Sequence, residues 1–136
     1  MTAAVHEHLV QLRWSDPDSY GHVNHARALS LFEDARLTWA AAAPSTQDGG
    51  QPDVILARLE VDYLRQLYYR AGERLCLRSW ITRIGTKSIT MRQELIQDDQ
   101  AAIRLDAICV VFDYAADATR ALTDEERTFW GGYLAR

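Results

Sequence analysis

The sequence predicts an α+β protein with an antiparallel sheet of about five strands, one long helix and a short C-terminal helix. Two patterns indicate this fold class. Apolar residues recur at helical spacing between about residues 24 and 43, and they alternate with polar residues along four later stretches. The 136 residues have the size of one domain, so residues 1–136 are expected to form a single unit.

The first strand is expected from about Glu7, because every second residue in the range 8–14 is apolar or aromatic. Pro17 cannot donate to a strand ladder and disfavours helix at Asp16, so the strand should end there. Gly21 permits the positive φ that a sharp turn requires. A strand followed by a tight turn is therefore predicted before the helix.

The long helix is expected from Asn24 or His25 to Ala43, with Asn24 as its N-cap. Its apolar residues recur at steps of three and four, at Leu29, Phe32, Ala35 and Trp39. Pro44 then stops the helix.

Four strands are expected after that helix, because the hydrophobic period becomes two. They cover about residues 55–63, 75–82, 89–95 and 103–111, and their connections are residues 69–73, 85–86 and 97–100. Since all three connections are short, the four strands are predicted to form an antiparallel meander in sequence order. A short helix should begin at Thr123 and end near Gly131.

Composition excludes several classes of function. The net charge of −4 and the pI near 5.5 argue against a nucleic-acid binder, which needs a basic face. No apolar run is long enough to span a bilayer, and the N-terminus does not resemble a secretory signal. A cytoplasmic protein without membrane or nucleic-acid partners is therefore expected.

Cysteine and histidine spacing predicts neither a disulfide nor a metal site. Cys76 and Cys109 lie in strand-like apolar stretches and are expected to be small core residues. A zinc site is the alternative for the four histidines, His6, His8, His22 and His25. They are scattered over strand and loop without H-x-x-x-H spacing, so we expect no metal and no cofactor.

The side chains that could take part in catalysis are concentrated in residues 13–36, R-W-S-D-P-D-S-Y-G-H-V-N-H-A-R-A-L-S-L-F-E-D-A-R. Asp16 and Asp18 precede a helix N-terminus, which offers free N–H groups and about half a positive charge. A carboxylate at this place can attack a carbonyl or activate a water. The residues alone leave two interpretations open, a turn with capping acids or a catalytic site.

This stretch resembles the D-x-D-x-x-G-H-V-N-N-x-x-Y…F-E-x-x-R signature of hotdog acyl-CoA thioesterases related to 4-hydroxybenzoyl-CoA thioesterase. The segments A-R-L-E-V-D-Y-L-R and R-I-G-T-K-S-I-T are also similar, so the resemblance extends from about residue 7 to residue 128. It implies a sheet wrapped around the long helix, an acyl-CoA substrate, and a homodimer or homotetramer with the site at the subunit interface.

The resemblance also implies roles for individual residues. Asp18 would be the nucleophile or general base, and the backbone N–H of His25 would polarise the thioester carbonyl. Asn24 would cap the helix or touch the substrate. Lys87, and more loosely Arg83, would hold the phosphates of coenzyme A.

Two departures from the signature keep other functions open. His25 stands where the signature has a second asparagine, and Ala28 stands where it has tyrosine. The identity of the acyl group therefore cannot be inferred from the resemblance. The alternatives are a hotdog module that binds an acyl-thioester or apolar ligand without turnover, and a thioesterase that acts on acyl carrier protein.

Overall fold

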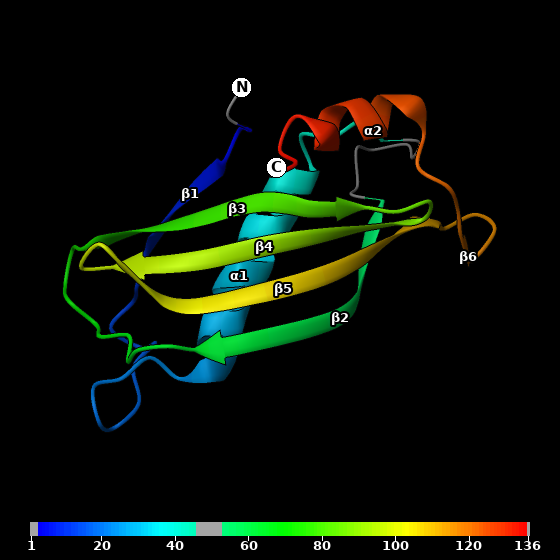
Figure 1. The fold of residues 1–136 in the computed structure, drawn as a ribbon. Helices are drawn as coiled ribbons and strands as arrows, with labels where there is room; N and C mark the ends of the chain where they lie inside the picture. The colour runs from blue at the N-terminus through cyan, green and yellow to red at the C-terminus, as the bar shows by residue number, and fades with distance from the viewer. Residues whose placement is uncertain (1–2, 46–52, 136) are drawn as a thin grey trace.

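A computed structural model describes residues 3–45 and 53–135 of the chain (Figure 1). The elements in order are β1 (His6–Gln11), α1 (His25–Ala40), β2 (Val54–Tyr63), β3 (Arg74–Ile84), β4 (Ser88–Gln97), β5 (Gln100–Asp113), β6 (Ala118–Thr119) and α2 (Asp124–Gly131). Neither helix of the described residues has the length and apolar character needed to cross a membrane.

The strands pair in the order β1-β3-β4-β5-β2, with the short β6 added to β5, and all neighbours are antiparallel. The predicted meander is therefore correct for β3, β4 and β5 and wrong for β2, which pairs with β5 instead of β3. The ten residues 64–73 make this possible, because they easily span three strand spacings of about 4.8 Å each. Strand β2 consequently forms one edge of the sheet.

Gln97 fixes the connection between β2 and β3 as it crosses the end of the sheet. Its Oε1 accepts the N–H of Tyr68 at 3.0 Å, and its Nε2 donates to the Tyr68 carbonyl at 2.9 Å and to Glu73 Oε1 at 2.7 Å. Leu67, which belongs to the same segment, is buried. The connection is thus held by one buried side chain at the end of β4.

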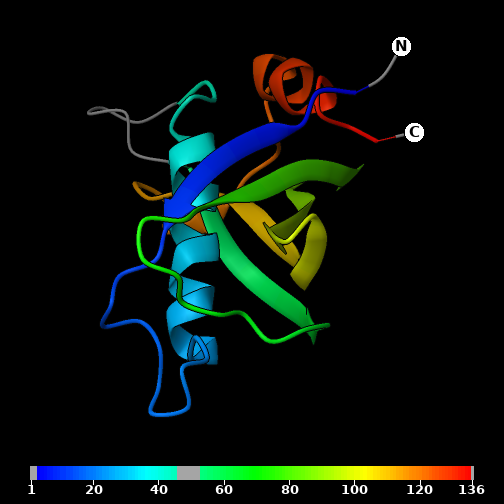
Figure 2. The same ribbon diagram turned by 90° about the vertical axis from the view of Figure 1, so that its left-hand side faces the viewer.

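Helix α1 lies against one face of the curved sheet (Figures 1 and 2). Its fully buried residues are Ala28, Phe32, Ala35 and Trp39. They face the inward side chains of the sheet, which include Leu77, Ile81, Ile89, Met91, Leu95, Leu105, Ala107 and Val111. The sheet wraps the helix, which confirms the hotdog fold.

Helix α1 begins at His25, as predicted, but ends at Ala40, three residues before the predicted Ala43. The chain tightens there, because Ala42 and Ala43 donate to carbonyls three residues back, at 3.0 Å each. Helix α2 has the predicted start, where Thr123 forms a capping box.

Strand β2 departs from simple alternation at one bulge. Leu56 and Arg58 pair with the adjacent residues Cys109 and Ile108, so Ala57 is the extra residue. The predicted alternation through residues 55–63 is therefore broken at that point.

Both cysteines are free thiols, and the prediction of a core position is correct for Cys109. Burial raises the pKa of Cys109 to about 11. Cys76 is half-buried in β3, and desolvation together with Glu7 raises its pKa as well.

Replacing Gln97 with leucine should lower the free energy of unfolding by about 1–3 kcal/mol, because it leaves the N–H of Tyr68 without its acceptor. Urea denaturation measures this change. Gln100→Leu is the matched control, since Gln100 is exposed at the same hairpin and its substitution should have little effect. Equal stabilities for the two variants would contradict the role of Gln97.

Candidate active site

The loop between β1 and α1 is organised by Asp16, which is 3% exposed. Its Oδ2 accepts the backbone N–H of Arg13 at 2.7 Å, and its Oδ1 accepts Arg13 Nη2 at 3.0 Å. Arg27 Nε, from the first turn of α1, lies 4.0 Å from the same Oδ1. The Asp16 carboxylate is thus engaged by two arginines. Strand β1 ends at Gln11, three residues before the end of the apolar pattern and short of the predicted end at Asp16.

Asp18 has a different environment from Asp16, because its side chain is exposed. Its Oδ1 accepts the N–H groups of Tyr20 at 2.9 Å and His22 at 3.3 Å. Its Oδ2 takes part in none of the hydrogen bonds of the described residues. The turn closes through Gly21, whose φ of +78° suits glycine. One carboxylate oxygen is therefore fixed by the backbone, and the other is available to a ligand.

Asn24 and His25 form the start of α1 beside that turn. The Asn24 side chain accepts the N–H of Ala26 at 2.8 Å, which confirms the predicted N-cap. Within the described residues the backbone N–H of His25 has no acceptor. The His25 ring packs edge-to-face on Tyr63, with ring centroids 6.3 Å apart. The helix thus presents a free donor at its positive end.

Asp18, Asn24 and His25 all line one cleft of about 550 Å³. It is lined by Asp18, His22, Val23, Asn24, His25, Tyr63, Leu64, Arg65, Gln66, Leu67 and Ile103. One wall comes from the loop before α1 and the other from the β2–β3 connection. The two walls are joined by a hydrogen bond from the Val23 N–H to the Leu67 carbonyl, at 2.9 Å, and by edge-to-face packing of His22 on Tyr68.

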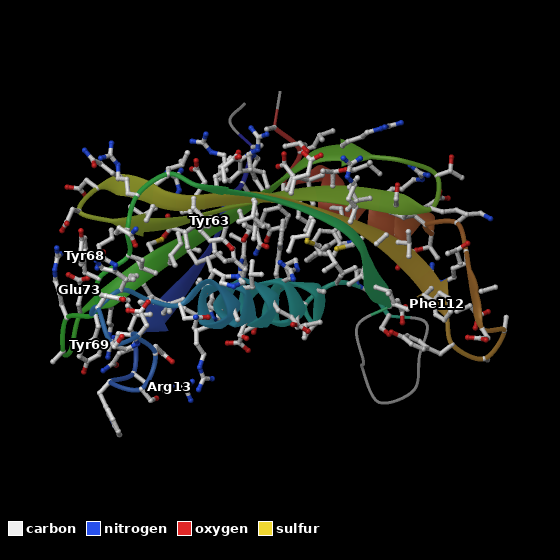
Figure 3. All side chains as sticks on the ribbon, turned by 90° about the horizontal axis from the view of Figure 1, so that it is seen from below. Arg13, Tyr63, Tyr68, Tyr69, Glu73 and Phe112 are labelled. Atoms are coloured by element: carbon white, nitrogen blue, oxygen red, sulfur yellow. The ribbon has the colours of Figure 1, made fainter. Side chains whose placement is uncertain are left out.

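The predicted phosphate-binding residues lie elsewhere in the same chain. Lys87 belongs to the β3–β4 turn, where the N–H of Val111 donates to its carbonyl at 2.8 Å, and Arg83 lies in the last residues of β3 beside that turn. Ile103, which lines the cleft, lies eight residues earlier on β5, roughly 27 Å away along an extended strand. Figure 3 shows this separation: Arg13, Tyr68 and Tyr69 lie at the end of the sheet where α1 begins, and Phe112 lies at the other end.

Arg65 is the cleft residue that the sequence analysis did not single out. It is exposed on the cleft rim, and its side chain makes no ion pair among residues 3–45 and 53–135. Its backbone N–H donates to the Ala102 carbonyl at 3.0 Å, which fixes its place. The only signal in the sequence was its position at the end of the family-like segment A-R-L-E-V-D-Y-L-R.

The four histidines are not gathered into a metal site. No group of three or more potential histidine, cysteine or carboxylate ligands occurs in the described part of the chain. His6 instead stacks on Trp39, with ring centroids 5.4 Å apart. Burial, with a smaller effect of His8, lowers the pKa of His6.

Fold and cleft together define this protein as a hotdog protein with a carboxylate and a free helix N-terminus in one cleft. The model of the thioesterase-like superfamily matches residues 12–126. The chain therefore belongs to the thioesterase-like superfamily.

The chain is also similar to individual proteins of this kind. YsmA, an uncharacterised protein of Bacillus subtilis, is 26% identical over 82 residues, which are 60% of this chain and 54% of that protein. The match thus spans about half the length of that relative.

Solved structures have the same fold over nearly the whole chain. A predicted thioesterase from Bacillus stearothermophilus has a TM-score of 0.87 at 23% identity, with 98% of each chain covered. A thioesterase from Thermus thermophilus, complexed with coenzyme A and zinc, has a TM-score of 0.76 at 26% identity, covering 93% of this chain and 96% of that one. A Staphylococcus aureus protein in complex with CoA has a TM-score of 0.84 at 14% identity, covering 98% and 85%.

The helix cap gives a direct test of how the cleft is built. Asn24→Ala should lower the free energy of unfolding by about 1 kcal/mol, because the N–H of Ala26 loses its acceptor. Asn24→Asp retains an acceptor and should stay close to the wild type. Chemical denaturation of all three proteins measures the difference, and equal losses in both variants would show that the side-chain cap contributes nothing.

Proposed function

We propose that this protein hydrolyses an acyl-CoA thioester to a carboxylic acid and free coenzyme A. The observation that supports it best is that the free Oδ2 of Asp18 and the free N–H of His25 border one cleft. Membership of the thioesterase-like superfamily agrees with this chemistry. Two similar structures contain coenzyme A, which favours a CoA thioester as substrate.

The proposed reaction needs a group that attacks the carbonyl and a donor that stabilises the oxygen that becomes negative. Asp18 acts either by attacking the carbonyl carbon, which forms an anhydride that water then cleaves, or by taking a proton from an attacking water. The His25 N–H donates to the developing oxyanion, and the helix dipole adds to this stabilisation. The thiolate of coenzyme A leaves and is protonated.

Asp18→Asn should reduce kcat by about 10²–10⁴-fold on a panel of acyl-CoA substrates, because asparagine neither attacks nor accepts the proton. Asp117→Asn is the matched control: Asp117 is exposed, lies outside the cleft, and has a φ of +52° that asparagine tolerates. Undiminished activity of Asp18→Asn would overturn the assignment of Asp18. Saturable binding of acyl-CoA without thiol release by the wild type would instead support a non-catalytic binding module.

We also propose that two copies associate along β2. This ten-residue strand lies at the sheet edge, and Leu56, Tyr63 and Leu64 beside that edge are 44–52% exposed. An unpaired edge with apolar neighbours favours antiparallel pairing with a second copy. Two-fold pairing would bring the partner's β3–β4 turn toward the cleft end of this chain. Lys87 and Arg83 would then reach coenzyme A only across the interface.

The phosphates of coenzyme A thus have two candidate sources of positive charge, Arg65 in the same chain and Lys87 from a second copy. Arg65→Ala should raise KM for acyl-CoA about tenfold and leave KM for the same acyl group on N-acetylcysteamine unchanged, because the short thioester carries no phosphate. Lys87→Ala, measured in parallel, should do the same only if the copies pair as proposed.

Steady-state kinetics with a third substrate, the same acyl group on acyl carrier protein, tests whether the natural substrate is bound to coenzyme A or to the carrier protein. A rise in KM with all three thioesters would show that Arg65 positions the acyl end and does not hold the phosphates. A higher kcat/KM with acyl carrier protein than with CoA would replace the proposed substrate by a carrier-bound one.

A further inference from the structure

The turn that carries Asp18 has few contacts with the rest of the protein, because residues 18–21 are all exposed. The turn is closed within itself. The N–H of Asp18 donates to the His22 carbonyl at 2.7 Å, and the N–H of His22 donates back to Asp18 Oδ1 at 3.3 Å. Asp16 anchors the loop before this turn, and the half-buried His22 anchors it afterwards. The place of Asp18 beside the cleft therefore depends on what holds His22.

His22 is held by the β2–β3 connection through its backbone and through its ring. Its backbone pairs antiparallel with that of Tyr68, and the N–H of the next residue, Val23, donates to the Leu67 carbonyl at 2.9 Å. The rings of His22 and Tyr68 pack edge-to-face, with centroids 5.3 Å apart and planes at 76°. Aromatic pairs in this arrangement are more stable than their buried area alone would make them. The ring contact opposes a pivoting of the turn about its backbone pairing.

Tyr68 is itself fixed by the core of the protein. Gln97, which is buried at the end of β4, binds both its N–H and its carbonyl, at 3.0 and 2.9 Å. Tyr68 is nevertheless 44% exposed and lies outside the hydrophobic core. It lies at the end of the sheet where α1 begins, as does Arg13 of the loop before Asp18 (Figure 3). A continuous series of contacts thus leads from β4 through Tyr68 and His22 to Asp18.

We propose that Tyr68 is a positioning residue for Asp18. Tyr68 does not line the cleft, so it acts through the ring of His22 and not by touching the substrate. The catalytic consequence rests on the proposed function, whereas the holding of the turn does not depend on any reaction. Correct placement of a reacting group is decisive, because a displacement of about 1 Å can reduce the rate roughly 10²-fold.

Tyr68→Leu should lower kcat for acyl-CoA hydrolysis about tenfold and leave KM within about twofold, because leucine cannot pack edge-to-face on His22. Tyr68→Phe keeps the ring and should retain the wild-type kcat. Tyr114→Leu is the matched control, since Tyr114 is 47% exposed and packs edge-to-face on Phe112, at the other end of the sheet (Figure 3). Tyr68→Leu added to Asp18→Asn should cause no further loss of kcat, because effects that act through one group are not additive.

Amide hydrogen exchange, followed by NMR, tests the same contact without a substrate. The N–H of His22 should exchange about tenfold faster in Tyr68→Leu than in the wild type, because the turn opens more often. Its exchange should be unchanged in Tyr68→Phe and in Tyr114→Leu. The N–H of Met91, a fully buried residue of the central strand β4, is the internal reference for global unfolding.

Four results would each overturn the inference. The first is an unchanged exchange rate of the His22 N–H in Tyr68→Leu, and the second is an equal acceleration at His22 and Met91, which would indicate general destabilisation. The third is a loss of kcat that is just as large in the Asp18→Asn background. The fourth is a rise in KM with kcat unchanged, which would make Tyr68 a substrate contact. If the wild type hydrolyses no thioester, the proposed function alone fails, and the exchange rates decide whether Tyr68 holds the turn.

Discussion

Burial of α1 in the curve of the sheet is the constraint on which the rest of the structure depends. Four of its side chains are completely removed from solvent, and two of these, Ala28 and Ala35, are small enough to let the helix backbone approach the strands closely. Because the helix is fixed along its length, its first turn stays at one end of the sheet. The free N–H of His25 and the preceding turn with Asp18 are therefore held by the hydrophobic core.

Polar side chains on the inner face of β4 connect that core to the cleft and to a buried arginine of α1. Gln93 and Gln97 lie on the same face as the buried leucine and methionine of this strand. Gln97 holds the connection that forms one wall of the cleft, and Gln93 orients the guanidinium of Arg36. A buried amide leaves few alternative arrangements for its partners, because each lost hydrogen bond is costly in an apolar environment. One strand thus fixes both a wall of the cleft and the buried guanidinium of Arg36.

Hydrophobic period identifies α1 and the strands from the sequence, since burial on one face determines which residues are apolar. The Asn24 cap is equally local, and it was predicted correctly. The pairing of β2 with β5 was not predicted, because an alternating pattern indicates which face of a strand is buried but not which strand lies beside it. Arg65 was missed for a related reason: an exposed loop arginine has no local signature, and only the crossing connection brings it to the cleft.

The edge position of β2 also has a consequence for the order in which the chain assembles. Val54 pairs with Val111, which follows it by 57 residues, so β2 is synthesised well before its partner strand β5. During synthesis its backbone donors and acceptors stay unpaired, whereas β3 and β4 can form a hairpin at once. Long-range pairings of this kind slow folding and expose strands to intermolecular contacts. We expect nascent chains truncated before β5 to be the aggregation-prone form of this protein.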